Sequence, residues 1–398
     1  MKTRNFLLGA ATGFVAGYAA YRACEAAASL LNPPGAVAPD AKTYGMTRRS
    51  LTMAGLARSL AAGAASAFGP AAKSMERAVD GVPVWLRSPL FAAQVSLLEA
   101  ILELPVDFVE GHELERRYGL STQPAASWFS DYCKQQAIGT GVTVVLSGLL
   151  AAALRTWPKK WPYIASAATF PLLLLANVVI PVYVLPLFNK YEPLEGPLEE
   201  RLRALASRYG VGDADILRVD MSKQTKKANA FVIGIFGTHR IVVGDTLVDH
   251  FTPEEIEFVV AHELGHYVSR DTWRMMAAAQ LSATAVIFGA FAALGEPKPK
   301  HMRRPRTLAK IQFTAVALTQ ILRPALAAFS RSREWAADRF ALSATNAPRT
   351  GAAAFRRLRD QNLAEDEQPA WFEFLFSTHP SLKARIAALE SLSAFSPP

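Results

Sequence analysis

Long apolar segments recur along this chain and are separated by short polar or basic turns. The two clearest cover residues 137–154 and 164–187, and each approaches the roughly 20 helical residues that cross the hydrocarbon core of a bilayer. Similar runs cover 91–109, 273–294 and 311–329. The pattern predicts a mainly α-helical protein that crosses a membrane several times.

The N-terminal part has a weaker pattern. Residues 6–31 are apolar after two basic residues, which predicts a signal anchor or a first span, with a cleaved signal peptide as the alternative. Residues 32–52 are polar and predict a loop. The short run 53–68 is interrupted by a charge and fits an interfacial or packed helix as well as a span. We therefore expect about five to seven spans.

Soluble character begins near residue 189 and is interrupted by the last two apolar runs. The stretch 229–245 predicts a β-hairpin, and a helical pattern covers 198–209. We expect three domains: an N-terminal anchor with a weakly structured region (1–83), a group of membrane helices (84–188), and a third domain (189–398) that holds a small β-hairpin or sheet and spans near 273–294 and 311–329.

A helix start is encoded just before the most informative motif. Thr252 suits the N-cap, Pro253 the first helical position, and Glu255 completes a capping box.

Two other segments contain no further apolar run. Residues 110–136 are polar and predict a loop, and the segment after residue 331 is also without such a run.

The helix that begins at Pro253 carries the pattern His-Glu-x-x-His. His262 and His266 are four residues apart, so both imidazoles can bind one metal ion from one face of the helix, and Glu263 can take a proton from water. This is the arrangement of zinc hydrolases, and the alternative is an amphipathic helix with two incidental histidines. Glu334 is a candidate third ligand, and Asp338 can hydrogen-bond the far nitrogen of a ligand histidine. Taken alone, these two acids would fit a solvated pair better, but they follow a His-Glu-x-x-His motif in the same chain.

Composition narrows the class of protein. Of the 398 residues 51% are hydrophobic and 19% charged, which favours a membrane protein. Cys24 and Cys133 are too few for a disulfide framework or a four-thiolate zinc site. The net charge of +9 is not gathered into an aromatic-interleaved patch, so we expect anionic lipid and no nucleic acid as partners.

Three carboxylates lie in or near the apolar run 91–109. Glu99, Glu103 and Asp107 follow one another at four-residue spacing, so they must face protein or water instead of lipid. They are the one feature that would suit a transporter, and a water-filled interior or a helix contact is the alternative interpretation.

Together these motifs resemble the M48 metallopeptidases, most closely the branch of the CAAX prenyl protease of the second type (Ste24-like). The similarity runs from about residue 90 to 390. The matching segments are Tyr118-Gly119-Leu120-Ser121 with Asp131 and Lys134, Pro186-Leu187-Phe188-Asn189, Asn229-Ala230-Phe231, His262-Glu263-Leu264-Gly265-His266, Ser330-Arg331 with Glu334 and Ala337-Asp338, and His379-Pro380-Ser381 with Arg385.

The resemblance implies a polytopic α-helical membrane protein with a zincin-type (gluzincin) metallopeptidase domain. One Zn²⁺ ion per chain would be bound by His262, His266 and Glu334, and Glu263 would activate water.

Further site residues follow from the same resemblance. Asp338 would support a ligand histidine or serve in proton transfer, and His379 would lie near the developing oxyanion. Asn229, Ala230 and Arg385 would bind substrate. A strand that begins at Ala230 could hold an extended peptide by its edge, although it could also simply support the zinc helix.

The expected function is that of a zinc-dependent integral-membrane endopeptidase, acting on prenylated (CAAX-type) or other membrane-associated peptides. An HtpX-like quality-control protease is one alternative. A non-proteolytic membrane chaperone or scaffold with a structural metal site is another, although such sites normally have four protein ligands. The partners would be a peptide or protein substrate and membrane lipid.

The expected location is a bacterial inner membrane or an ER-type membrane. The basic turns 155–160 and 298–310 should lie opposite the zinc helix, so the positive-inside rule would place the active site away from the cytoplasm, whereas the resemblance favours access from the cytoplasm.

Overall fold

The computed structural model describes residues 40–235, 239–295 and 298–393. The elements in chain order are α2 (Ala41–Phe68), α3 (Pro70–Ala78), α4 (Val84–Phe108), η1 (Val109–Glu113), α5 (Leu114–Arg117), α6 (Ala125–Thr156), α7 (Trp161–Val179), η2 (Ile180–Val184), η3 (Leu185–Leu187), β1 (Tyr191–Pro193), α8 (Pro197–Arg208), β2 (Asp215–Val219), η4 (Met221–Lys223), β3 (Ala230–Ile233), β4 (Arg240–Gly244), α9 (Asp245–Val248), α10 (Pro253–Val268), α11 (Asp271–Leu294), α12 (Pro299–Met302), α13 (Arg306–Thr345), α14 (Pro348–Gln361), α15 (Ala370–Phe376) and α16 (Leu382–Ser393). The predicted mainly α fold with a small sheet is confirmed.

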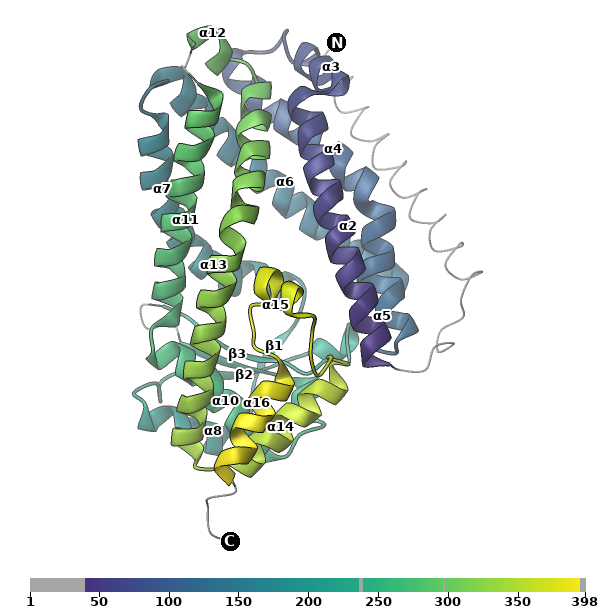
Figure 1. The fold of residues 1–398 in the computed structure, drawn as a ribbon, viewed down its shortest axis with the longest axis vertical. Helices are drawn as coiled ribbons and strands as arrows, with labels where there is room; N and C mark the ends of the chain where they lie inside the picture. Colours follow the sequence, from purple (N-terminus) through teal and green to yellow (C-terminus); the bar gives the residue numbers. More distant parts are fainter. Residues whose placement is uncertain (1–39, 236–238, 296–297, 394–398) are drawn as a thin grey trace.

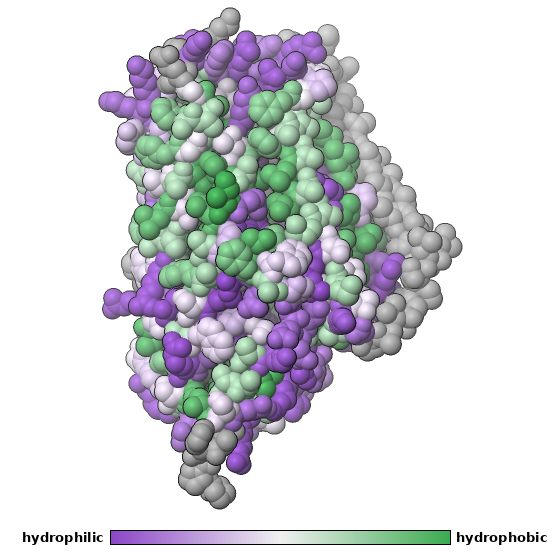
Figure 2. All heavy atoms as spheres, in the orientation of Figure 1, coloured by the Kyte–Doolittle hydropathy of each residue, from purple (hydrophilic) through white to green (hydrophobic). Residues whose placement is uncertain are grey.

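Five helical segments of the described chain are long and apolar enough to cross a membrane. They cover Val84–Arg117, Ala125–Thr156, Trp161–Leu187, Asp271–Leu294 and Arg306–Thr345. Figure 2 shows hydrophobic residues spread over the outer surface of this bundle, with hydrophilic residues gathered at both ends. Leu281 and Ile321 are 73% and 72% exposed there. Such apolar side chains are covered by lipid when the bundle lies in a membrane.

The predicted loop at residues 32–52 and the weakly structured region that extends to residue 83 are wrong for the described residues. Helix α2 begins at Ala41, where the Asp40 side chain accepts hydrogen bonds from two backbone N–H groups. The helix then runs beside α13 and α4 (Figure 1). Packing against helices distant in sequence stabilises it, and hydropathy alone does not register such packing. The expected first span at residues 6–31 lies outside the described residues.

Two further boundaries differ from the sequence prediction. The expected loop at 110–136 is mostly helical, because α4 continues through η1 and α5 and because α6 begins at Ala125. The apolar run 311–329 and the acidic pair that follows it belong to one 40-residue helix, α13. The C-terminal part of α13 therefore extends beyond the membrane bundle and places its side chains in the site.

The sheet has four strands in the order β1-β2-β4-β3. Strand β3 pairs antiparallel with β4, with Ala230 opposite Val243, so the predicted hairpin is present, although β3 ends at Ile233. Residues 236–238 of the predicted hairpin lie outside the described residues. Strand β3 is the edge of the sheet and lies next to α10.

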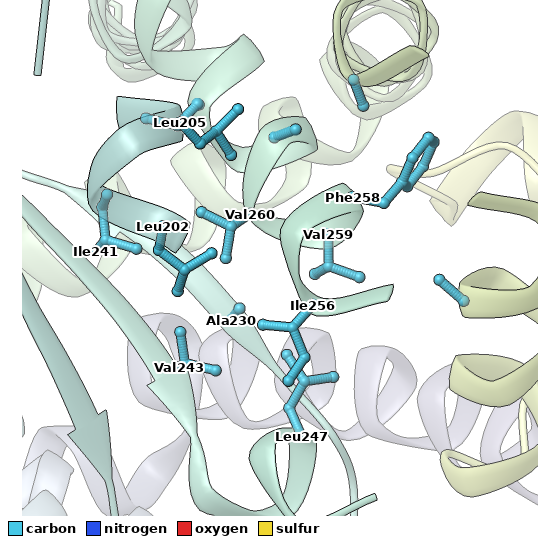
Figure 3. Packing of buried hydrophobic residues seen from close by; sticks show 14 of the residues in the cluster. Leu202, Leu205, Ala230, Ile241, Val243, Leu247, Ile256, Phe258, Val259 and Val260 are labelled. Atoms are coloured by element: carbon cyan, nitrogen blue, oxygen red, sulfur yellow. The ribbon is translucent and has the colours of Figure 1, made fainter. Parts of the chain in front are cut away.

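The core of the peptidase region is built between this sheet and helices α8, α10, α14 and α16. Figure 3 shows Leu202 and Leu205 of α8 facing Ile241 of β4 and Val260 of α10. All four side chains are at most 1% exposed. Burying each such side chain contributes roughly 1.5–3 kcal/mol, so α10 is held rigidly over the sheet.

The loop between α5 and α6 joins the bundle to the peptidase region. Ser121 forms an isolated β-bridge with Thr225, and its hydroxyl donates to the backbone carbonyl of Gln224 at 3.0 Å. At the opposite end of the bundle, α12 and the α6–α7 turn lie together, far from α10 (Figure 1). The two basic turns are therefore remote from the zinc helix, as expected.

Candidate active site

Helix α10 presents the His-Glu-x-x-His motif because its start and its packing are both specified. The Thr252 hydroxyl accepts from the Glu255 backbone N–H at 3.3 Å, and the Glu255 carboxylate accepts from the Thr252 N–H at 2.9 Å, so the predicted capping box is present. Further along, a Cβ at Gly265 would come within 3.1 Å of the Ala337 Cα of α13. The glycine therefore allows the close helix contact that brings Glu334, one turn before Ala337, to the histidines.

Three ligand-type side chains meet between α10 and α13. Nε2 of His262 lies 3.4 Å from Oε2 of Glu334, and Nε2 of His266 lies 3.3 Å from its Oε1. One ligand atom from each residue lies within 4.8 Å of the others. Glu334 Oε2 is buried and accepts no hydrogen bond from the described part of the chain. Two imidazole nitrogens and a carboxylate converging in this way fit a zinc ion.

A carboxylate holds the outer nitrogen of each histidine. Nδ1 of His262 lies 2.9 Å from Oδ1 of Asp338, and Nδ1 of His266 lies 3.0 Å from Oδ2 of Asp271. Such a contact keeps the proton on Nδ1 and leaves the Nε2 lone pair for a metal. Both imidazoles are thus oriented toward the same point, beside Glu334.

Asp271 is not among the site residues predicted from the sequence. This residue is the first of α11, is 4% exposed, and also forms an ion pair with Arg333 at 2.8 Å. It reaches His266 because Arg270 adopts a left-handed conformation (φ 56°) that turns the chain between α10 and α11. An acidic residue shortly after the motif was the available signal, but the turn that folds it back is not visible in the sequence.

Glu263 lies beside this grouping and lines a cavity of about 370 Å³. Burial raises the pKa of its carboxyl, and the neighbouring His262 and His266 act in the opposite direction. A carboxylate whose pKa lies above its ordinary value accepts a proton more readily near neutral pH. Its position and environment therefore suit a general base.

The cavity also brings together other residues that the sequence singled out. Asn229 and Ala230 line it where strand β3 begins. The His379 side chain is 63% exposed, with Nε2 3.5 Å from Glu334 Oε1, so it lies at the mouth of the grouping. The edge of β3, the imidazole of His379 and the ligand-type residues therefore lie around the same cavity.

Arg385 also lines the cavity, but its hydrogen bonds are made to the protein. Its Nε and Nη2 donate to the two Asp338 oxygens at 2.8 and 2.5 Å, and its guanidinium lies 4.2 Å from the Phe355 ring centroid. These contacts position Asp338, and through it His262. Substrate binding by Arg385 stays a prediction.

The whole-chain comparisons agree with this geometry. The model of Peptidase family M48 matches residues 193–393, the part of the chain that holds the site. The chain belongs to peptidase family M48. A second model, described as the CAAX prenyl protease N-terminal region with five membrane helices, matches residues 39–190 of this M48 peptidase.

Relatives of this M48 peptidase come from several kingdoms. A CAAX prenyl protease 1 homolog of Oryza sativa subsp. japonica is 30% identical, over 77% of this chain and 73% of that protein. The uncharacterized metalloprotease YhfN of Bacillus subtilis is 27% identical, over 77% of this chain and 74% of that protein. The crystal structure of S. mikatae Ste24p matches with a TM-score of 0.67 and 25% identity, covering 76% of this chain and 75% of that one.

These findings confirm the Ste24-like resemblance, but the expected second type is wrong, because the relatives are named CAAX prenyl protease 1. This M48 peptidase is a zinc metalloendopeptidase and a multi-pass integral membrane protein.

Proposed function

We propose that this enzyme cleaves prenylated or similarly lipidated peptides at the junction between its membrane helices and its peptidase region. The observation that carries the proposal is the position of the ligand grouping. Its third member, Glu334, belongs to the same helix as a membrane span, so the site lies directly at the end of the bundle. The name of the rice relative, a CAAX prenyl protease 1 homolog, supports the same class of substrate.

The roles of the ligand-type residues follow from their contacts. His262, His266 and Glu334 would hold the zinc ion, and the carboxylates of Asp338 and Asp271 would fix the imidazole orientations. When bound, zinc polarises a carbonyl and lowers the pKa of a coordinated water to about 7.

The remaining residues act on substrate and protons. Glu263 takes a proton from the attacking water and can return it to the leaving amine. His379, at the mouth of the grouping, donates a hydrogen bond to the carbonyl oxygen as negative charge develops on it. The outer edge of β3 starts in the same cavity at Ala230 and offers backbone hydrogen bonds to an extended peptide.

We also propose a domain boundary between η3 and β1, near residue 188. The membrane helices before it and the peptidase elements after it correspond to the two family models that match residues 39–190 and 193–393. The peptidase domain then includes α11 and most of α13 as its own membrane spans.

The test is a cleavage profile of the purified, zinc-loaded protein in detergent or liposomes. A fluorescent farnesylated CAAX-type peptide is compared with the same peptide lacking the farnesyl group and with a misfolded membrane protein. We expect fast, chelator-sensitive cleavage of the farnesylated peptide. Equal cleavage of the peptide with and without the lipid would reject the lipidated class, and preferential cleavage of the misfolded protein would favour a quality-control role.

A further inference from the structure

The start of strand β3 is held by a side chain from the end of α14. Asn362 directly follows that helix, and its amide contacts the backbone of Ala228 twice. Its Oδ1 accepts from the Ala228 N–H at 2.8 Å, and its Nδ2 donates to the Ala228 carbonyl oxygen at 3.2 Å. One side-chain amide thus satisfies both backbone groups of one residue, as a residue of a neighbouring strand would. Asn362 therefore takes the place of a strand partner beside Ala228.

This contact lies on the edge of β3 that faces away from β4. The Asn229 carbonyl oxygen accepts from the Gly244 N–H at 2.9 Å and so points toward β4. Successive residues of an extended strand direct their backbone groups to opposite edges, so Ala228 and Ala230 both face the outer edge. Asn362 occupies this edge at Ala228, and Ala230 provides the next outward-facing groups. Ala228, Ala230 and Asn362 all line the active-site cavity.

The chain around Asn362 is fixed by distant contacts. Leu363 adopts a left-handed conformation (φ 51°), which is uncommon for a bulky residue and persists only where the surroundings enforce it. Its side chain packs against a buried cluster from α2, α5 and the loop after α5, made of Tyr44, Leu114, Tyr118 and Leu120. The turn out of α14 is therefore set by the packing of the bundle end, and it directs the Asn362 amide toward Ala228.

We propose that Asn362 is a positioning residue that ends the peptide-binding edge of β3 and sets the register of the bound substrate. The inference rests on the proposed function, because it requires a peptide that pairs with the outer edge of β3. Since the amide already occupies the backbone groups of Ala228, a bound peptide pairs from Ala230 onward and does not continue along the edge past Asn362.

The register decides which bond is cleaved. Alternate residues of a strand face the same edge, so the nearest alternative register differs by two residues, or about 6.6 Å. A shift of this size presents a different peptide bond to His262, His266 and Glu334. An amide that closes the edge at one end therefore determines the cleavage position, although it does not touch the reacting atoms.

The test measures the hydrogen bonds and the register separately, on the zinc-loaded full-length enzyme. Amide hydrogen exchange of residues 226–233 without peptide reports the contact, and exchange in α10 reports correct folding. Product masses and rates are measured with the farnesylated CAAX-type peptide, its unfarnesylated form, and oxidised insulin B chain, an unmodified peptide that offers many bonds. The variants are Asn362→Ala, which removes the amide, and Asn362→Asp, which keeps the acceptor and the volume but loses the donor.

Gln361→Ala is the matched control. The neighbouring Gln361 amide also binds this region, because its Nε2 donates to the carbonyl oxygens of Lys226 and Thr246 at 2.8 and 3.1 Å, but its side chain lies outside the active-site cavity. If Asn362 only stabilised the segment, the two alanine variants would behave alike. If it sets the register, only Asn362→Ala changes the products.

We expect exchange in residues 226–233 to be about tenfold faster or more in Asn362→Ala, with exchange in α10 unchanged. The rate at the parent cleavage position should fall about twofold to tenfold, the range for a lost hydrogen bond of a neutral amide, and new products cut two residues away should appear. Asn362→Asp should keep the parent product pattern with intermediate exchange. Gln361→Ala should also keep that pattern.

A parent-like product pattern in Asn362→Ala would overturn the inference, as would unchanged exchange in that variant or the same product shift in Gln361→Ala. The proposed function fails in a different way. Equal cleavage of the CAAX-type peptide with and without its farnesyl group would reject the lipidated substrate class, whereas a product shift on the insulin chain confined to Asn362→Ala would still support the register role.

Discussion

The active site and the contact between α2 and α4 both place ionisable side chains among apolar helices, but they are organised differently. At the active site, the histidines and Glu334 converge on one point, and outer carboxylates orient them. At the α2–α4 contact, one arginine neutralises the acids: Arg58 lies 2.9 Å from Glu103 and 3.3 Å from Glu110. At the active site, the ligand atoms face one another around one point. At the α2–α4 contact, Arg58 forms ion pairs with the glutamates instead.

This difference decides how the acidic residues of α4 are interpreted. Glu99, Glu103 and Asp107 line a cavity of about 430 Å³, and Ser66 of α2 lies 3.5 Å from Glu99. Because Arg58 pairs with Glu103 and Ser66 lies beside Glu99, the acidic residues of α4 form a polar contact with α2 around a small cavity. No chain of charged groups crossing the described bundle is needed to explain them. The active site carries the chemistry, and the polar contact between α2 and α4 helps to attach α2 to the bundle.

Glu263→Gln gives the sharpest test of the active site. We expect peptidase activity to fall by about a thousandfold or more while the zinc content stays at that of the parent, because the base is lost and the ligands remain. Cleavage rates and metal analysis on the same preparation measure both effects. Glu254→Gln, in the exposed first turn of the same helix, is the control and should be nearly silent. Parent-like activity in Glu263→Gln would disprove the assigned role.

Glu334→Ala should act on the metal itself. Removing one of three protein ligands lowers zinc affinity, so we expect substoichiometric zinc after dialysis and a loss of activity that excess zinc partly restores. Metal analysis after dialysis against a weak chelator provides the measurement. Undiminished zinc content would remove Glu334 from the ligand set.

Asp271→Asn tests the carboxylate that orients His266. The amide cannot accept the Nδ1 proton of His266 as strongly, so zinc affinity should fall by about 10–100-fold with a smaller effect on folding. A competition titration with a fluorescent zinc indicator measures the affinity. The exposed Asp360→Asn serves as the matched substitution, and equal affinities in the two variants would show that Asp271 does not position His266.

Arg58→Ala should instead affect the stability of the bundle. It leaves two glutamates of α4 and η1 without their cation, which we expect to cost about 1–3 kcal/mol of unfolding free energy. The Tm in detergent should fall by several degrees, while activity per folded molecule stays close to that of the parent. Arg58→Lys should recover part of the stability, and the exposed Lys73→Ala should change little. Lost activity at unchanged stability would place this contact in the reaction.

Local sequence patterns predict part of the fold and part of the active site. The capping box and the four-residue spacing of His262 and His266 act within one helix, so the sequence specifies them directly. The apolar runs specify membrane helices for the same reason, since a span is defined by its own composition. Glu334 could be predicted from the sequence because Asp338 lies one turn away on the same helix.

Other features depend on contacts between distant segments. Helix α2 forms where a loop was expected because its N-terminal part packs against α5 and the helix as a whole lies along α13. Asp271 reaches His266 because Arg270 turns the chain. Such contacts are stabilised by packing across the whole molecule, so the folded arrangement decides them where no local pattern could.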